Sequence, residues 1–347
     1  MSDSEEAFRP WTMRQPRRPK DRKARRAGEE RNQAGDEPAR GRRPVFPDGL
    51  AAVVSDSNPP PISYDGESGV PVNKKSLGNL AVRILTSAVA APILLYLLFI
   101  APPWGFGGLV VVASLAAALE LFTITIPGKR LHQAIGVGST AMVFATTAAT
   151  SHWHRPEALA GALVALVIVA MLAGLVRPGN PAAAATRTAW LVAGPIYLGV
   201  LLAALLLLFL KPNGAGWVVL VMTVSWFGDT AAYFTGRALG KHKLYGLVSP
   251  KKTAEGAVGG LVGSALAAVL ASLWYLPELR IGTGLALAIV AGALGQLGDL
   301  CVSLIKRSAG VKESGFLVPG HGGILDRVDA LLFVAGTVWV YTVFFSG

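Results

Sequence analysis

The chain has 347 residues, of which 52% are hydrophobic and only 15% are charged, and its mean hydropathy is +0.49. Soluble domains usually carry about a quarter charged residues, so this composition argues against an ordinary soluble protein. The single Cys301 excludes an internal disulfide and a cysteine-based zinc cluster. The net charge of +11 is better explained by basic cytoplasmic loops near anionic lipid than by nucleic-acid binding.

Residues 1–75 form a polar N-terminal segment that holds 15 of the 32 Lys and Arg residues and 12 of the 21 Asp and Glu residues. This segment has no sustained apolar period, and we predict a disordered basic tail. Its run Arg14–Arg26 is either a tether to anionic lipid or simply solvated. No secretory signal peptide is visible, so the tail is expected to stay in the cytoplasm.

Long apolar segments fill the rest of the chain, and a membrane-spanning helix needs about 20 apolar residues. Nine candidates lie near 80–101, 106–126, 132–150, 158–176, 188–210, 216–235, 256–276, 282–305 and 328–345. The expected fold is therefore all-α, a polytopic integral membrane helical bundle of about nine transmembrane helices with a cytoplasmic N-terminus.

The distribution of basic residues supports this orientation. With the tail inside, the cytoplasmic loops would contain 13 Lys and Arg residues and the outer loops only 3. We divide the chain into the tail 1–75, N-terminal transmembrane helices 76–222, and a catalytic transmembrane region 223–347 with two cytoplasmic loops. The absence of a strong internal repeat weakens an inverted-repeat transporter interpretation.

Only nine acidic residues follow residue 75, and an acid within an apolar helix is a candidate for function. Asp299 shares one helix face with Gln296, Ser303 and Lys306, at spacings of three, four and three. Interhelical hydrogen bonding would explain the glutamine and the serine. A carboxylate there is more costly, which favours a functional role.

Two further acids, Asp326 and Asp329, stand three apart at the start of the last apolar segment, next to His321 and Arg327. They could simply complement the positive end of the helix dipole. Carboxylates on different helices, with no cysteine cluster and few histidines, also suit a hard cation such as Mg²⁺.

The remaining acidic candidates are weaker. Asp229 ends the sixth segment one turn before Tyr233 and could instead pair with Arg237. Glu120, in the second segment, is the weakest candidate and could merely neutralise a basic neighbour.

Basic residues and glycines gather in the two cytoplasmic loops of the last region, which lie within residues 225–256 and 296–329. Phosphoryl and nucleotidyl transfer both need fixed positive charge, which could come from Lys241, Lys243, Lys251, Lys252, Lys306, Arg307 and Arg327. Glycines let backbone N–H groups approach phosphate, as Gly320, Gly322 and Gly323 could do, although no Walker A motif is present. His321 could donate to a phosphate or be structural.

Together these patterns resemble the phosphatidate cytidylyltransferase family, also called CDP-diglyceride synthases. The matching positions, within about 223–332, are Asp229 to Tyr233, Gly240 to Gly256, Ser303, Lys306, Arg307, Lys312, Pro319 to Gly323, Asp326, Arg327 and Asp329. Two positions depart from the family pattern. Glu313 stands where the family usually has Asp, and Ala254 where it often has Trp.

The resemblance implies transfer of CMP from CTP to phosphatidate, giving CDP-diacylglycerol and pyrophosphate for phospholipid biosynthesis. It implies Mg²⁺ assistance, in a two-metal site whose ligands would be Asp299 and Asp326. Catalytic candidates are then Asp299, Asp326, Lys306, Arg307, His321 and Arg327. Substrate-binding candidates are Asp229, Tyr233, Lys241, Lys243, Ser249, Lys251, Lys252, Thr253, Glu255, Ser303, Lys312, Gly320, Gly322, Gly323 and Asp329.

The expected partners are CTP, phosphatidate from the bilayer and membrane lipids, without nucleic acid, and a homodimer is left open. The expected location is the cell (inner) membrane, with the active site facing the cytoplasm. Two alternatives remain. A CTP-dependent polyprenol kinase would release CDP instead of pyrophosphate, and an anion transporter would place ionisable residues near the midplane of several helices.

Overall fold

The computed structural model describes residues 74–153, 156–318 and 322–345, and most of these residues are helical. The predicted tail, apart from its last two residues, and the candidates Gly320 and His321 lie outside these ranges. The helices are α1 (Lys74–Phe99), α2 (Pro103–Thr125), α3 (Arg130–Trp153), α4 (Pro156–Leu175), α5 (Pro181–Pro195), α6 (Leu201–Phe209), α7 (Gly214–Leu239), α8 (Ala254–Trp274), α9 (Ile281–Ser308) and α10 (Leu325–Phe344), with a π-helix, η2 (Ile196–Val200), between α5 and α6.

Proline and side-chain caps fix several helix starts. Pro103 and Pro181 lie in the first turn of α2 and α5, where the missing N–H costs nothing. The Asn180 side chain accepts a hydrogen bond of 2.9 Å from the backbone N–H of Ala182, which caps α5. Thr253 caps α8 in the same way, accepting from the Gly256 N–H at 3.1 Å.

Each of the nine predicted apolar segments contains a helix, which confirms the all-α polytopic fold class. Seven stretches within the described ranges are long and apolar enough to cross a membrane: α2, α4, the continuous stretch Pro181–Phe209, α7, α8, α9 and α10. The apolar part of α1, Ile84–Phe99, is shorter, and α3 is not among the seven. The number of crossings and the side of the N-terminus therefore stay predictions.

The segment predicted at 188–210 is helical throughout but not regular. The π-helix η2 interrupts it directly after Pro195, which ends α5. Proline cannot donate a backbone hydrogen bond, so the ladder of bonds is broken at this point. The sequence rule that joins apolar residues into one helix does not detect such a change of pitch.

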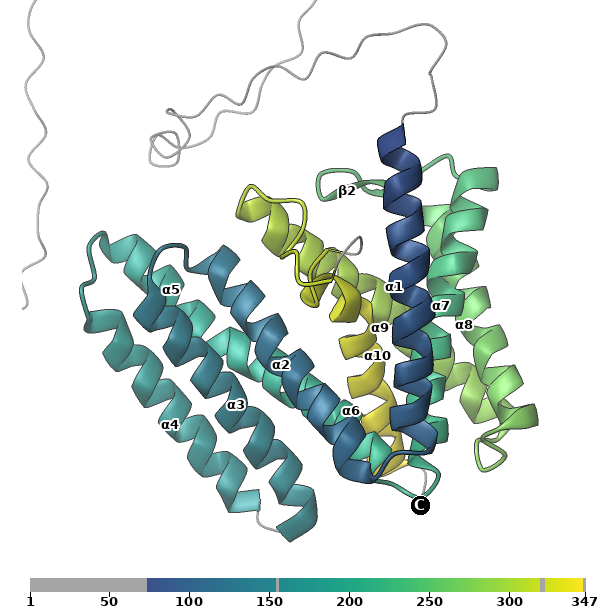
Figure 1. Cartoon of the computed structure of the whole chain (residues 1–347), viewed down its shortest axis with the longest axis horizontal. Coiled ribbons are helices and arrows are strands. Elements are labelled where there is room, and N and C mark those ends of the chain that lie inside the picture. Colours follow the sequence, from purple (N-terminus) through teal and green to yellow (C-terminus); the bar gives the residue numbers. More distant parts are fainter. Residues whose placement is uncertain (1–73, 154–155, 319–321, 346–347) are drawn as a thin grey trace, which may run out of the picture. The chain divides into compact units, whose positions relative to one another are not determined.

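A β-hairpin connects α7 to α8 and was not predicted. Strand β1 (Lys243–Tyr245) pairs antiparallel with β2 (Ser249–Thr253), and Lys243 lies opposite Thr253. Figure 1 shows the hairpin near the upper ends of the helices that it joins. This small sheet places Lys251 and Lys252 directly before α8.

Helices α7, α8, α9 and α10 pack on one another, and α10 also contacts α2 and α6. Small residues allow α7 and α8 to approach closely, since a side chain on Gly263 would collide with the backbone of Phe227. The Ser264 hydroxyl also donates to the Val224 carbonyl at 3.1 Å. The predicted boundary at residue 222 falls inside α7 and marks no break in the chain path.

Candidate active site

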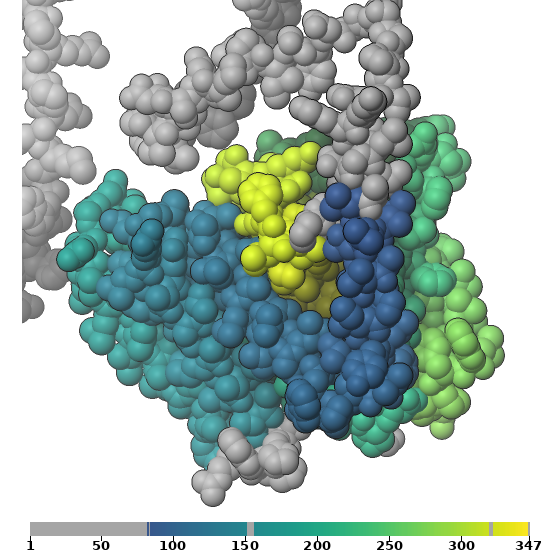
Figure 2. All heavy atoms as spheres, in the orientation of Figure 1, coloured from purple at the N-terminus to yellow at the C-terminus, as the bar shows by residue number. Residues whose placement is uncertain are grey.

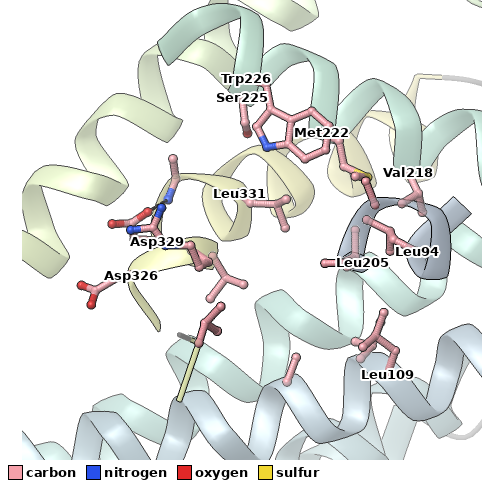
Figure 3. Close-up of a pocket in the computed structure, with 18 of the residues that line it drawn as sticks. Leu94, Leu109, Leu205, Val218, Met222, Ser225, Trp226, Asp326, Asp329 and Leu331 are labelled. Carbon is pink, nitrogen blue, oxygen red and sulfur yellow. Dashed lines mark hydrogen bonds between the residues drawn. The ribbon is translucent and has the colours of Figure 1, made fainter. Parts of the chain in front are cut away.

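An apolar groove of about 530 Å³ ends in a cluster of charged residues. Its walls come from α1, α2, α6, α7 and α10. In Figure 3, Leu94, Leu109 and Leu205 lie toward one end of the groove, while Asp326 and Asp329 lie toward the other. Figure 2 shows the yellow C-terminal part of the chain at the surface between dark-blue α1 and the lighter-blue helices that follow.

The charged end brings together acids that are far apart in the sequence. Asp229 from α7 and Asp326, Arg327 and Asp329 from the start of α10 all line the groove. Two of these acids, Asp229 and Asp329, lie within electrostatic reach of Asp299 on α9. Carboxylates that repel one another require positive charge nearby, and α9, α10 and the hairpin supply it.

Lys252, at the end of β2, provides part of that charge. Its Nζ lies 2.6 Å from Oδ2 of Asp299, and the two side chains are 30% and 28% exposed. The Ser303 hydroxyl donates to the other oxygen of Asp299 at 3.2 Å. Within the predicted stripe on α9, Asp299 thus contacts the hairpin, while Gln296 donates to the Ala257 carbonyl of α8 at 3.1 Å.

A second lysine–aspartate pair lies deeper. Nζ of Lys306 is 2.6 Å from Oδ1 of Asp326, and these side chains are only 10% and 6% exposed. The other oxygen of Asp326 accepts hydrogen bonds from the backbone N–H groups of Ser314 at 2.8 Å and Gly323 at 3.2 Å. Asp326 therefore joins α9, the segment that follows it and the first turn of α10.

Gly322 needs the conformational freedom of glycine. Its φ is +81°, and a Cβ at this position would lie 3.3 Å from Asp326 and 3.4 Å from the carboxylate of Glu313. Its carbonyl accepts a hydrogen bond from the Val318 N–H at 3.0 Å. Glu313, the first departure from the family pattern, thus lies beside the start of α10 and carries its charge there.

Glu120 lies beside the candidate site, and the sequence interpretation undervalued it. It is 5% exposed on α2, and its carboxylate accepts from the Ser314 hydroxyl at 2.8 Å and from the N–H groups of Ile324 at 3.0 Å and Leu325 at 2.9 Å. Within the described ranges no Lys or Arg pairs with it, so the interpretation as a neutralising partner is wrong. Only its burial in an apolar segment hinted at a role.

The hairpin is fastened to α8 by Glu255. Its carboxylate accepts from the backbone N–H groups of Lys241 and His242 at 3.1 and 3.2 Å, and Nδ1 of His242 lies 2.6 Å from it. The side chains of Lys241, Lys243 and Lys251 are exposed. The hairpin therefore presents several ammonium groups to solvent and one, Lys252, to the acids.

Other candidates lie outside the charged cluster. Arg237 donates to the Tyr233 hydroxyl at 3.1 Å, so the proposed Asp229–Arg237 pair does not form. Arg307 is exposed and donates to the Val311 carbonyl at 2.9 Å, and Lys312 is exposed as well. Ser249 is half-buried at the start of β2.

The two acids predicted as metal ligands differ in how well they suit a cation. No group of three or more His, Cys, Asp or Glu side chains that could hold a metal occurs in the described part of the chain. Mg²⁺ commonly binds one or two carboxylates together with substrate phosphates, so such a group is not required. Asp299 fits, because it is partly exposed and already holds a cationic ammonium. Asp326 is nearly buried and holds Lys306 and two amides.

Comparison of the sequence with known proteins identifies the family of this chain. A sequence model described as the cytidylyltransferase family matches residues 81–345, about three-quarters of the chain. The chain belongs to the cytidylyltransferase family. The match includes α2 and Glu120 as well as the two charged loops, so it extends well beyond the motifs of residues 223–332.

Two relatives of this chain share the name phosphatidate cytidylyltransferase. The chain is 44% identical over 124 residues to a phosphatidate cytidylyltransferase of Staphylococcus haemolyticus, which is 36% of this chain and 48% of the relative. It is 46% identical over 134 residues to a phosphatidate cytidylyltransferase of Synechocystis, which is 38% and 45% respectively. The chain thus spans about half the length of these relatives.

Proposed function

We propose that this protein transfers CMP from CTP to phosphatidate, giving CDP-diacylglycerol and pyrophosphate for phospholipid biosynthesis. The observation that carries the proposal is the groove whose apolar walls end at Asp326, Arg327 and Asp329. Lys306 is paired with the first of these residues. A lipid with two acyl chains and one phosphate has the same division into an apolar and a charged part. The names of the relatives support this substrate.

In the proposed reaction an oxygen of the lipid phosphate attacks the α-phosphorus of CTP. A new P–O bond forms there, the bond to the bridging oxygen of the β-phosphate breaks, and pyrophosphate leaves with that electron pair. The attacking phosphate is already an anion at neutral pH, so no strong general base is needed. The difficulty is to bring two anions together.

The lysines and Arg327 are suited to reduce that repulsion. Lys252 is partly exposed and can exchange its contact with Asp299 for a phosphate oxygen. Arg327 is exposed and lines the charged end of the groove. The exposed lysines of the hairpin, Lys241, Lys243 and Lys251, would attract the triphosphate from solution.

We also propose that Mg²⁺ assists the reaction, with Asp299 as the favoured ligand and Asp326 as the second. A bound divalent cation would offset negative charge on the transferred phosphate and the leaving pyrophosphate. Binding at Asp326 would require Lys306 to move. The cytoplasmic face of the cell membrane is the proposed location, in keeping with the basic loops.

Product analysis tests the proposal. The detergent-purified full chain would be given phosphatidate, Mg²⁺ and CTP labelled at either the α- or the γ-phosphate. We expect the α-label in the lipid fraction and the γ-label in pyrophosphate. The γ-label in lipid would identify a kinase, and no label in lipid with active controls would reject the transfer.

A further inference from the structure

The buried carboxylate of Glu120 has partners that lie about 200 positions away in the chain. It accepts hydrogen bonds from the Ser314 hydroxyl and from the backbone N–H groups of Ile324 and Leu325, at the start of α10. A carboxylate at the start of a helix is stabilised by the helix dipole, and bonds to a charged acceptor are stronger than neutral ones. Glu120 thus attaches the N-terminal half of the protein to the candidate active site.

Ser314 lies between two carboxylates. Its hydroxyl donates to Glu120 at 2.8 Å, while its backbone N–H donates to Asp326 at 2.8 Å. Asp326 in turn holds Lys306 at 2.6 Å. A continuous chain of bonds therefore runs from α2 through Ser314 to the buried lysine–aspartate pair.

Two glycines lie so close to the Glu120 carboxylate that any side chain at their positions would meet it. A Cβ on Gly315 would lie 2.6 Å from Oε1 of Glu120, and one on Gly323 would collide with both Glu120 and Ser314. The segment on each side of the carboxylate is thus shaped around it. A side chain that serves only to fill space would not be met by three donors at once.

We infer that Glu120 is a positioning residue for the transfer reaction, which holds the Ser314 segment and the first turn of α10 so that Asp326 and Arg327 line the groove. This inference rests on the proposed function. It makes the charged end of the groove depend on α2, which lies outside the signature motifs, and it gives a reason for a buried acid without a cationic partner in the described residues.

The substitution Glu120→Gln tests the inference with little change in volume. Glutamine keeps one acceptor oxygen and loses the other together with the negative charge, so the three bonds cannot all form. Misplacement of reacting groups lowers turnover steeply, and we expect kcat to fall about 10- to 100-fold with less than about a threefold change in KM for CTP. Glu157→Gln, an exposed acid in the first turn of α4, is the matched control and should be unchanged.

Hydrogen–deuterium exchange provides a readout that does not depend on activity. In Glu120→Gln, peptides that contain the Ser314, Ile324 and Leu325 amides should exchange faster, while peptides of α8 and α3 should not. If wild type fails to transfer CMP, the proposed function fails, yet the exchange result still tests the bonds of Glu120.

Ser314→Ala is the second test variant. It removes the hydroxyl that donates to Glu120 but keeps the backbone N–H that donates to Asp326. If Glu120 acts through Ser314, the double variant should lose less activity than the product of the two single losses. Wild-type kcat in Glu120→Gln would overturn the inference. Faster exchange throughout α2, α3 and α8 would also overturn it, since that result marks a general loss of packing.

Discussion

The two lysine–aspartate pairs differ in burial, and this difference separates their roles. Lys306 and Asp326 are 10% and 6% exposed, whereas Lys252 and Asp299 are 30% and 28% exposed. Removing one member of a buried pair leaves the other charge out of water and without an opposite charge, while a partly exposed pair is screened. Lys306 therefore maintains the site, and Lys252 is freer to change partners.

This contrast predicts different stabilities for Lys306→Met and Lys252→Met. We expect Lys306→Met to lower the free energy of unfolding by about 3–5 kcal/mol. Lys252→Met should cost at most about 1 kcal/mol, because its pair is partly solvated. Denaturant unfolding in detergent measures both. Equal losses for the two variants would contradict the assignment of roles.

Asp299→Asn tests the proposed metal ligand. The amide keeps the shape but not the charge, so turnover at saturating substrates should fall about 100- to 1000-fold. Half-maximal activity should also require more Mg²⁺, which a titration of rate against metal concentration measures. Full turnover at the wild-type Mg²⁺ requirement, in a folded variant, would exclude Asp299 as a ligand.

For single residues, the sequence singled out some members of the candidate site and missed the contacts of Glu120. Asp299 was singled out because an acid in an apolar helix is costly and therefore informative. Lys306 was singled out because it shares a helix face with Asp299, and Asp326 because it stands beside His321 and Arg327. The contacts of Glu120 could not be found, because its partners are 194 to 205 positions away. No local pattern links α2 to the start of α10.

Among the elements, the crossing of α7 and α8 depends on glycine. Gly263 is buried, and a Cβ there would lie 2.6 Å from the Ala231 Cβ and collide with the Phe227 carbonyl. We expect Gly263→Ala to lower the free energy of unfolding by about 1–3 kcal/mol through overpacking.

Gly161→Ala is the matched control, because this exposed helical glycine in α4 has open space around its Cβ position. Alanine favours a helix over glycine, so the control should be neutral or stabilising by up to about 1 kcal/mol. Thermal unfolding of both variants decides the matter. A stable Gly263→Ala protein would show that α7 and α8 can move apart at no cost.

The helices were more predictable than their connections. Apolar length and proline positions gave all nine helical segments, since these features act locally. The hairpin Lys243–Thr253 was not predicted, because its short strands are lysine-rich and mostly accessible to solvent and lack an apolar alternation. The π-helix after Pro195 escaped because hydropathy does not encode helical pitch.

Considered as a whole, the described part of the protein combines five helices around a groove that no single segment predicts. Thr86 and Leu94 come from α1, Leu205 from α6 and Met222 from α7, yet all line the same space. The composition indicated a membrane protein, and the family resemblance indicated a lipid substrate. The proposed location of the acyl chains depends on the packing of distant helices.

The most direct test of the account is to find where the lipid lies. A phosphatidate analogue with a photoreactive diazirine in one acyl chain would be cross-linked to the full protein and the labelled peptides identified. We predict labels in α2 and α6 near Leu109 and Leu205, which decrease when unlabelled phosphatidate competes. Labels confined to exposed faces of α4 and α8, and insensitive to competition, would contradict the assignment of the groove to the lipid substrate.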